Sequence, residues 1–350
     1  MIQRYIISNF KSIDKETIEL SALNLFSGHN SAGKTSAIQA LLTAADNMTD
    51  TERGHYAVAR HLPPMTFNEV RNYLLNAKSY NITIENNDKT VALNFTSADD
   101  AMIKTSVTQN GIPDEDFLSQ IKDNLFYLPA MRTAKLDKTT INTNPDTTNI
   151  GLNAEYVIDY FQNHHSDVLD EDLLSVETKT LDAQVNYWLQ KLTGYTMNVT
   201  FENSRYVVRF IGKGGKELMP CHVGTGVSYI AQVVMICMAS KKNSLIIVEN
   251  PEIHLHPSAQ ATMIDFLAMI SKTGRQVIVE SHSDHIFNGI RRLLHNNTIS
   301  LENVCVTNFN QNELGITLAT KIEFSQNGGL IKYTPGLFDQ FDEDLDSILS

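Results

Sequence analysis

Cysteine is scarce in this sequence. The 350 residues include three cysteines, Cys221, Cys237 and Cys305, which lie far apart. Their number is odd and no two form a C-x-x-C pair, so neither a disulfide framework nor a zinc site is indicated. The pattern fits a reducing compartment.

Long hydrophobic runs are also missing. No stretch approaches the roughly 18 apolar residues of a membrane span, and residues 1–5 lack the charged and apolar regions of a signal peptide. We therefore expect a cytoplasmic protein that neither crosses a membrane nor is exported. Hydrophobic residues still make up 42% of the chain, enough to bury a full core, which excludes the fibrous and disordered classes.

Basic residues are in deficit, with 28 Lys and Arg against 40 Asp and Glu and a formal net charge of −12. Part of the acidic excess lies in the last twelve residues, which contain five acids and no base. This balance argues against a globally basic binder of nucleic acid or of membrane surfaces, although it permits a local basic patch.

The order of predicted elements changes along the chain. Residues 80–109 predict a three-stranded β meander, residues 152–194 predict helices, and residues 196–211 predict a hairpin. From about Ser228 onward, helices alternate with apolar strands, which indicates a largely parallel sheet. Residues 134–150 are polar and rich in Thr and Asn, so we expect an exposed loop there.

A phosphate-binding loop is the strongest motif. Residues 28–35, G-H-N-S-A-G-K-T, match G-x-x-x-x-G-K-[ST] between an apolar strand and a predicted helix, as the motif requires. Backbone N–H groups of such a loop point at a polyphosphate, with Lys34 at the β and γ phosphates and Thr35 on Mg²⁺. A chance glycine turn is the alternative. The predicted nucleotide contacts are Asn30, Ser31, Ala32, Gly33, Lys34, Thr35 and Ser36.

A second part of such a site needs a carboxylate at the end of a buried strand, to hold the hydrated metal. Residues 245–249, L-I-I-V-E, supply Glu249. The continuation, N-P-E-I-H-L-H-P at residues 250–257, resembles the extended Walker B motif of ABC-type ATPases related to SMC, RecF and OLD proteins. The usual sequence of that motif is D-E-P-E-x-H-L-H-P. The form here, E-N-P-E-x-H-L-H-P, resembles that of a bacterial branch with a C-terminal domain of unknown function.

The departures from the usual spelling affect the chemistry. Asn250 stands where the family has its catalytic glutamate, and an amide can orient water but cannot accept its proton. Glu252 is then the nearest candidate base. His254 and His256 alternate on the same segment, but no further ligand is near, so a structural or dimer-contact role is preferred to a metal pair.

Two further segments resemble motifs of the same ATPases. Residues 280–283, E-S-H-S, resemble the switch segment, whose histidine senses the γ phosphate and corresponds to His282 here. Residues 223–228, V-G-T-G-V-S, resemble the ABC signature in a G-x-G-x-S form, carried by Gly224, Gly226 and Ser228. In the family this segment closes over ATP bound by the other subunit. The alternative is a glycine turn with Ser228 as helix N-cap.

Weaker matches extend the resemblance over residues 9–340. Residues 9–12, N-F-K-S, resemble an N-terminal family motif that makes Lys11 a candidate nucleotide contact. Residues 127–132 resemble a family segment ending in arginine, with a plain surface Arg132 as the equal alternative. Residues 284–292 and 335–339 also resemble the bacterial branch.

The resemblance implies a P-loop ATPase head of α/β class, with a RecA-like core, an antiparallel β subdomain and an inserted helical lobe. We expect one head over residues 1–350, its core formed by residues 1–60 and 205–350 and its β meander and helical lobe by residues 61–204. The 215 residues from Lys34 to Glu249 are too few for SMC-type coiled-coil arms.

The implied function is Mg-ATP binding and hydrolysis in a head-to-head dimer or higher oligomer. Relatives commonly occur in phage-defence operons, where the ATPase controls a separate effector such as a nuclease. DNA is a further candidate partner. The sequence stops about 60 residues after His282, so we expect no Toprim nuclease domain. The alternative is an antitoxin-like scaffold that binds ATP, dimerises and holds a toxic effector inactive while it hydrolyses little, and Asn250 is the main argument for it. A transporter ATPase is a poor third.

Overall fold

The computed structural model describes most of the chain. The described residues are 1–47, 51–53, 61–63, 65–87, 89–97, 103–110, 123–133 and 149–332, with isolated positions at 117, 121, 136, 139, 141–143 and 347–348. The segment 335–339, most of the acidic tail and much of the polar segment 134–150 lie outside the described residues.

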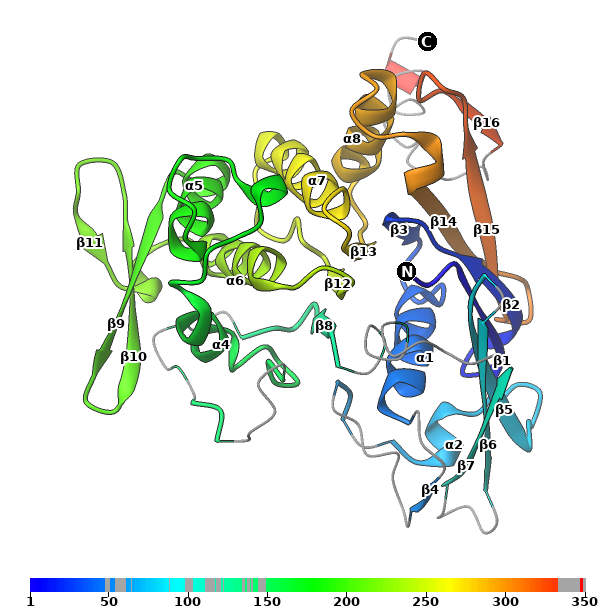
Figure 1. The fold of residues 1–350 in the computed structure, drawn as a ribbon. Coiled ribbons are helices and arrows are strands. Elements are labelled where there is room, and N and C mark those ends of the chain that lie inside the picture. Colours follow the sequence, from blue (N-terminus) through cyan, green and yellow to red (C-terminus); the bar gives the residue numbers. More distant parts are fainter. Residues whose placement is uncertain are drawn as a thin grey trace.

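A seven-stranded sheet forms the centre of the described structure (Figure 1). In sheet order its strands are β16 (Leu330–Lys332), β15 (Thr317–Phe324), β14 (Val304–Gln311), β3 (Leu23–Gly28), β13 (Gln276–Glu280), β12 (Leu245–Glu249) and β8 (Leu125–Leu128). The five strands from β14 to β8 run parallel. Strands β12 and β13 are buried at every residue because helices or a second sheet cover both faces.

Helices cover one face of this sheet. Val248 and Val279 point into a core shared with α4 (Val157–His164), α5 (Leu181–Thr193), α6 (Thr225–Ala239), α7 (Pro257–Ser271) and α8 (Asp284–His295). Ile247 and Ile278, their neighbours in sequence, point into a second core with α1 (Lys34–Asp46). This alternation follows from the two-residue period of a strand.

A six-stranded antiparallel sheet packs beyond α1 (Figure 1). In sheet order it contains β2 (Ile13–Glu19), β1 (Arg4–Phe10), β5 (Ser79–Asn86), β6 (Lys89–Ser97), β7 (Ile103–Asn110) and β4 (Thr51–Arg53). The predicted meander is confirmed, and β5 pairs with β1, so the meander extends the N-terminal strands. Strand β8 falls inside the predicted insertion 61–204, yet it belongs to the core sheet. The division into core and insertion stays a prediction.

The predicted hairpin at 196–211 is confirmed. Strands β9 (Thr196–Glu202), β10 (Arg205–Ile211) and β11 (Glu217–Leu218) form a small sheet that lies farthest from β1 in Figure 1. The remaining short helices are α2 (Phe67–Val70), η1 (Glu171–Leu173), η2 (Pro220–His222) and η3 (Leu301–Asn303).

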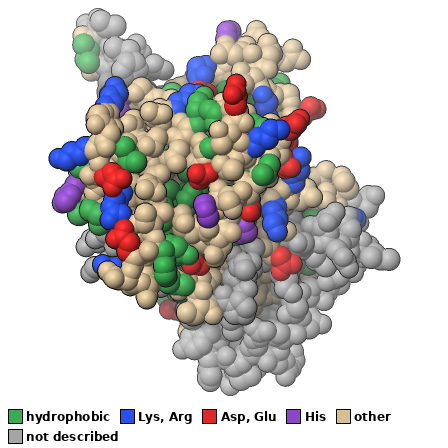
Figure 2. Space-filling view, turned by 60° about the vertical axis from the view of Figure 1, so that its left-hand side comes forward, with side chains coloured by type: hydrophobic (Ala, Val, Ile, Leu, Met, Phe, Trp, Pro, Cys, Tyr) green, Lys and Arg blue, Asp and Glu red, His purple; other side chains and the backbone are tan. Residues whose placement is uncertain are grey.

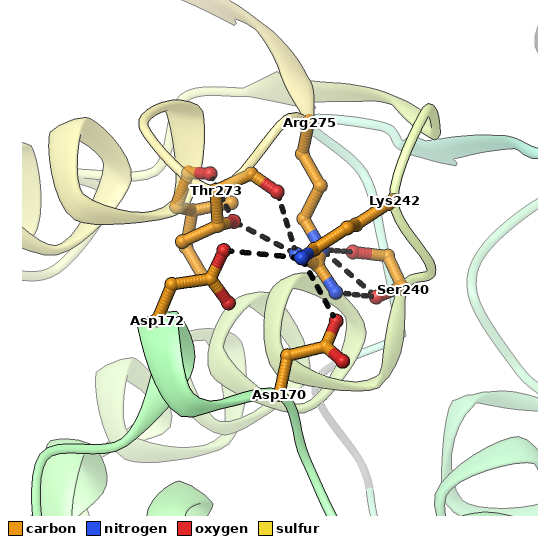
Figure 3. Close-up of polar contacts among 7 residues, drawn as sticks. Asp170, Asp172, Ser240, Lys242, Thr273 and Arg275 are labelled. Atoms are coloured by element: carbon orange, nitrogen blue, oxygen red, sulfur yellow. Dashed lines mark hydrogen bonds and ion pairs between the residues drawn. The ribbon is translucent and has the colours of Figure 1, made fainter.

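A polar cluster fastens the start of β13 to its neighbours (Figure 3). Arg275 is 2% exposed and donates to the Ser240 carbonyl after α6 and to Thr273 Oγ1 after α7, the latter at 2.8 Å. Lys242 lies beside it and forms ion pairs of 3.6 and 3.4 Å with Asp170 and Asp172 around η1. The buried Arg275 guanidinium therefore joins the segments that follow α6 and α7 to the start of β13. The exposed Lys242 links the residues around η1 to the same place.

The two cations should differ in their contribution to stability. Arg275→Met keeps the aliphatic stem but leaves buried oxygens without a donor, so we expect the free energy of unfolding to fall by about 3 kcal/mol. Lys242→Ala removes only half-exposed ion pairs and should cost less than about 1 kcal/mol. Urea unfolding of both variants measures this, and equal losses would contradict it.

Candidate functional site

The candidate site lies where three parallel strands end together. In β-sheet register Glu280 pairs with Phe26 on one side and with Glu249 on the other, so β3, β13 and β12 share one carboxyl-end edge. Open parallel sheets bind ligands at such edges. The edge holds a cavity of about 260 Å³, lined by Asn30, Ser31, Ala32, Gly33, Lys34, Thr35, Ser36, Ala130, Glu249, Asn250, Glu280 and His282.

The glycine loop between β3 and α1 is shaped by contacts that exclude side chains. Gly28 and Gly33 have φ of 131° and 110°, a region that favours glycine. A Cβ on Gly28 would lie 2.1 Å from the Phe309 carbonyl oxygen, and one on Gly33 would lie 2.3 Å from Thr317 Oγ1. Thr317 also donates to the Ala32 carbonyl at 3.0 Å. Strands β14 and β15 thus support the loop from behind.

Lys34 folds back over this loop. Its Nζ donates to the carbonyls of Gly28 at 3.0 Å and His29 at 2.8 Å, and the residue is 3% exposed. Burial lowers the pKa of the ammonium group, while the Glu280 carboxylate opposes that shift. Its two acceptors are loop carbonyls, which a bound phosphate oxygen could replace without moving the lysine far.

Two glutamates end adjacent strands at the cavity. Glu249, 4% exposed, accepts from the Tyr127 hydroxyl and from the Ala130 amide, both at 2.9 Å. Glu280, 5% exposed, accepts from Thr35 Oγ1 at 3.1 and 3.2 Å. The metal-binding hydroxyl predicted from sequence therefore contacts Glu280 and not Glu249.

Glu280 is a site residue that the sequence analysis missed. The motif resemblance in this segment assigns a role to His282 alone, yet a glutamate that follows the apolar residues 277–279 at a strand end is a visible signal. Burial is the main cause that raises the pKa of Glu280 to about 7. The charge of Glu249 raises it further, whereas Lys34 and the Thr35 hydroxyl lower it.

Arg132 is buried, at 2% exposed, so its reading as a plain surface arginine is wrong. Its Nη1 donates to the Glu249 carbonyl at 2.8 Å and its Nη2 to the Asn250 carbonyl at 3.3 Å. Its guanidinium lies 4.8 Å from the ring centre of Tyr229 on α6. Burial lowers its pKa to about 10, which leaves it charged at neutral pH. Arg132 therefore ties the end of β12 to α6.

Glu252 does not line the cavity, but it supports a residue that does. Its Oε1 accepts from the Ser281 hydroxyl at 2.6 Å and from the His282 amide at 3.1 Å. Its Oε2 is buried without a hydrogen-bond partner among the described residues. Burial raises the pKa of Glu252. The Glu252 carboxyl group thus holds the Ser281 hydroxyl and the His282 backbone through Oε1, and Oε2 accepts no hydrogen bond from the described residues.

Asn250 follows β12 and His282 comes shortly after β13, and both residues line the cavity. Asn250 has a φ of 45°, which asparagine tolerates better than most residues. Its backbone N–H donates to the Glu280 backbone carbonyl at 2.8 Å. The pKa of His282 is lowered, first by partial burial and then by the charges of Lys34 and His29.

Lys11 is not among the residues that line the cavity. It follows β1 with a φ of 50°, its ammonium group bonds to the Gln39 side chain on α1, and burial lowers its pKa. Nucleotide contact by Lys11 stays a prediction.

The glycine segment before α6 differs in detail from expectation. The helix begins at Thr225, three residues earlier than predicted, with Gly224 as its N-cap, so the alternative with Ser228 as N-cap is wrong. Ser228 is 1% exposed and its hydroxyl has no partner among the described residues. Gly226 packs so closely that a Cβ would lie 2.9 Å from the His254 carbonyl oxygen. Gly224 and Thr225 are the exposed residues at this helix end.

The two histidines after β12 make structural contacts. His256 caps α7 by accepting from the Ser258 amide, and the His254 ring lies 5.7 Å from that of Tyr229. Within the described ranges, no group of three or more His, Cys, Asp or Glu side chains is placed to hold a metal ion. Mg²⁺ needs fewer protein ligands, since it binds through one or two carboxylates and substrate phosphates. Thr35, Glu249 and Glu280 fit that requirement.

Comparisons with known proteins bear on the family and the fold of the chain. A family model described as "AAA domain, putative AbiEii toxin, Type IV TA system" matches residues 23–288. The OLD nuclease of Escherichia phage P2 is 22% identical over an alignment 333 positions long, and the match covers 79% of this chain and 55% of that protein. The chain thus spans about half the length of this curated relative.

Solved structures of SMC heads have the same fold. One is an SMC head bound to the C-terminal winged-helix domain of ScpA, with a TM-score of 0.61 and 13% identity over 93% of this chain and 98% of that one. Another is the SMC head of Thermotoga maritima, with a TM-score of 0.52 and 12% identity over 92% and 99%. The expected ABC-type ATPase head is confirmed. No helix in the described part of the chain has the length and apolar character to cross a bilayer.

Stability should depend on pH through Glu280. In the folded protein the Glu280 carboxyl group stays protonated up to about pH 7, whereas an ordinary glutamate ionises near pH 4.5. Protonation therefore stabilises the folded state below pH 4.5, and this contribution disappears as the pH rises through 7. The glutamine in Glu280→Gln cannot ionise, so the variant escapes this loss. The free energy of unfolding of the variant minus that of the parent should therefore increase by about 2 kcal/mol from pH 5 to pH 8.

Urea unfolding of both proteins at the two pH values, without nucleotide or magnesium, measures that difference. A difference that stays constant between pH 5 and pH 8 would contradict the raised pKa.

Proposed function

The chain belongs to the AAA-domain family described as putative AbiEii toxin of type IV toxin–antitoxin systems, and we propose that it uses ATP to dimerise and control a separate effector. It is a P-loop ATPase of the SMC and OLD type. The effector, the head-to-head dimer and a role in anti-phage defence are the proposed parts.

One observation carries the proposal: a single cavity brings the phosphate loop, two strand-end carboxylates and His282 together. The loop amides and Lys34 would bind the β and γ phosphates. Thr35 and one of the two strand-end carboxylates would hold Mg²⁺, which neutralises charge on the phosphates when it is bound. The protein would act mainly by positioning and electrostatics.

The attacking water needs an orienting group and a proton acceptor. Asn250 lines the cavity and could orient water, but its amide cannot take the proton. Glu252 has an unused buried oxygen and a raised pKa, and it is bound to the backbone of His282. We assign sensing of the γ phosphate to His282 and orientation of the water to Asn250. We assign proton transfer to Glu252 through an intervening water, because Glu252 does not itself line the cavity.

Dimerisation would complete the site. The exposed Gly224 and Thr225 lie at the start of α6, which no side chain caps among the described residues. The first amides and the positive end of the helix dipole would suit the γ phosphate of a second subunit. Ser228 is buried behind them, so its hydroxyl would need a small movement of this turn to take part. One of the similar SMC heads was solved with a domain of ScpA bound, which supports a separate protein partner here.

A nucleotide-gated scaffold with little hydrolysis is the second candidate, because Asn250 occupies the position of the usual catalytic base. DNA is the less favoured partner. Figure 2 shows Lys and Arg interspersed with Asp and Glu over the described part of one face, whereas a DNA clamp needs an extended basic surface.

Steady-state ATP hydrolysis with light scattering tests the proposal. Lys34→Ala should lose ATP binding, dimerisation and turnover together. Glu252→Gln should keep ATP binding and an ATP-dependent dimer while turnover falls by about 100-fold or more. Lys216→Ala is the control, since this exposed lysine lies beside the small β9–β10–β11 sheet and should leave all three unchanged.

The outcomes separate the two candidates. ATP-dependent dimers without turnover in the parent chain would favour the scaffold, and turnover that survives Lys34→Ala would refute the site assignment. Full activity in Glu252→Gln would leave the base unassigned and contradict the role given to Glu252.

A further inference from the structure

We propose that Glu280 is the carboxylate that places Mg²⁺ beside the phosphates together with Thr35, and that Glu249 acts as a positioning residue behind it. The inference deepens the proposed ATPase site and rests on it. It reverses the order expected from the sequence, in which Glu249 holds the metal and Glu280 has no role.

The sheet order places Glu280 nearer to the phosphate loop. Strand β13 lies directly beside β3, which leads into the loop, whereas β12 is one strand farther away. Adjacent strands are about 4.8 Å apart. At the same level of the sheet, the Glu280 backbone is therefore one strand spacing closer to β3 than the Glu249 backbone.

The hydrogen bonds agree with this order. Both oxygens of Glu280 accept from the Thr35 hydroxyl, the group that a P-loop uses for its metal. Glu249 instead has one oxygen bonded to Tyr127 and the other to the Ala130 amide, both on the far side of β12. These two donors come from β8 and the residues after it, so they hold the Glu249 carboxylate from the side opposite to Thr35.

The charges of the site favour a bound cation. Glu280 lies within hydrogen-bonding reach of Glu249, and the two side chains are largely buried. Lys34 is the cation whose charge reaches Glu280 in the described structure. Two adjacent buried carboxylates repel each other, and a divalent ion between Thr35 and Glu280 would offset that repulsion.

Direct metal binding distinguishes the two glutamates. Mn²⁺ serves as the probe, its binding is followed by electron paramagnetic resonance, and the nucleotide is adenylyl imidodiphosphate, which is not hydrolysed. Glu280→Gln should weaken Mn²⁺ binding by about tenfold or more, Glu249→Gln should weaken it less, and Glu280→Asp should recover part of the loss. Glu302→Gln, an exposed change of the same charge, is the control and should change nothing.

Nucleotide binding in EDTA separates this inference from the proposed function. Glu280→Gln should bind adenylyl imidodiphosphate without metal at least as well as the parent, since it removes a negative charge near the phosphates. If Glu249→Gln costs more Mn²⁺ affinity than Glu280→Gln, the inference is wrong while the nucleotide site stands. If the parent chain binds no nucleotide, the proposed function fails and the inference fails with it.

Discussion

The parallel register of β3, β13 and β12 is the constraint on which the site depends. Because Phe26, Glu280 and Glu249 lie at the same level of the sheet, the phosphate loop and both carboxylates meet at one edge. A shift of one residue in either pairing would turn a glutamate toward the opposite face and into a hydrophobic core. The buried apolar residues of each strand fix that register, since both faces of the sheet are covered.

Contacts behind this edge link it to the rest of the molecule. Arg132 joins the backbone at the end of β12 to Tyr229 on α6, and Glu252 joins the segment after β12 to the His282 backbone. Both side chains keep one buried polar atom without a partner among the described residues. Such unpaired atoms are costly in a protein interior.

The sequence predicts most features that depend on neighbouring residues alone. The phosphate loop, Glu249 and the alternation of helices and strands each depend on a short stretch whose period or spacing is visible. The fold confirms the alternation and places the loop and Glu249 at one cavity. Glu280 is visible as a glutamate at a strand end, but its contacts, like those of Arg132, could not be predicted in this way. Their roles depend on contacts with Thr35, 245 residues away, and with Glu249, 117 residues away. The helix start at Thr225 was missed because glycines at 224 and 226 resemble a turn.

The central claim is that one sheet edge holds the phosphates and their metal. A crystal structure with adenylyl imidodiphosphate and Mg²⁺ tests it most directly. The account predicts the phosphates on residues 28–36, with the metal between the Thr35 hydroxyl, the β and γ phosphates and the Glu280 carboxylate. A nucleotide bound elsewhere, or phosphates on the loop with a metal that contacts neither Thr35 nor Glu280, would contradict it.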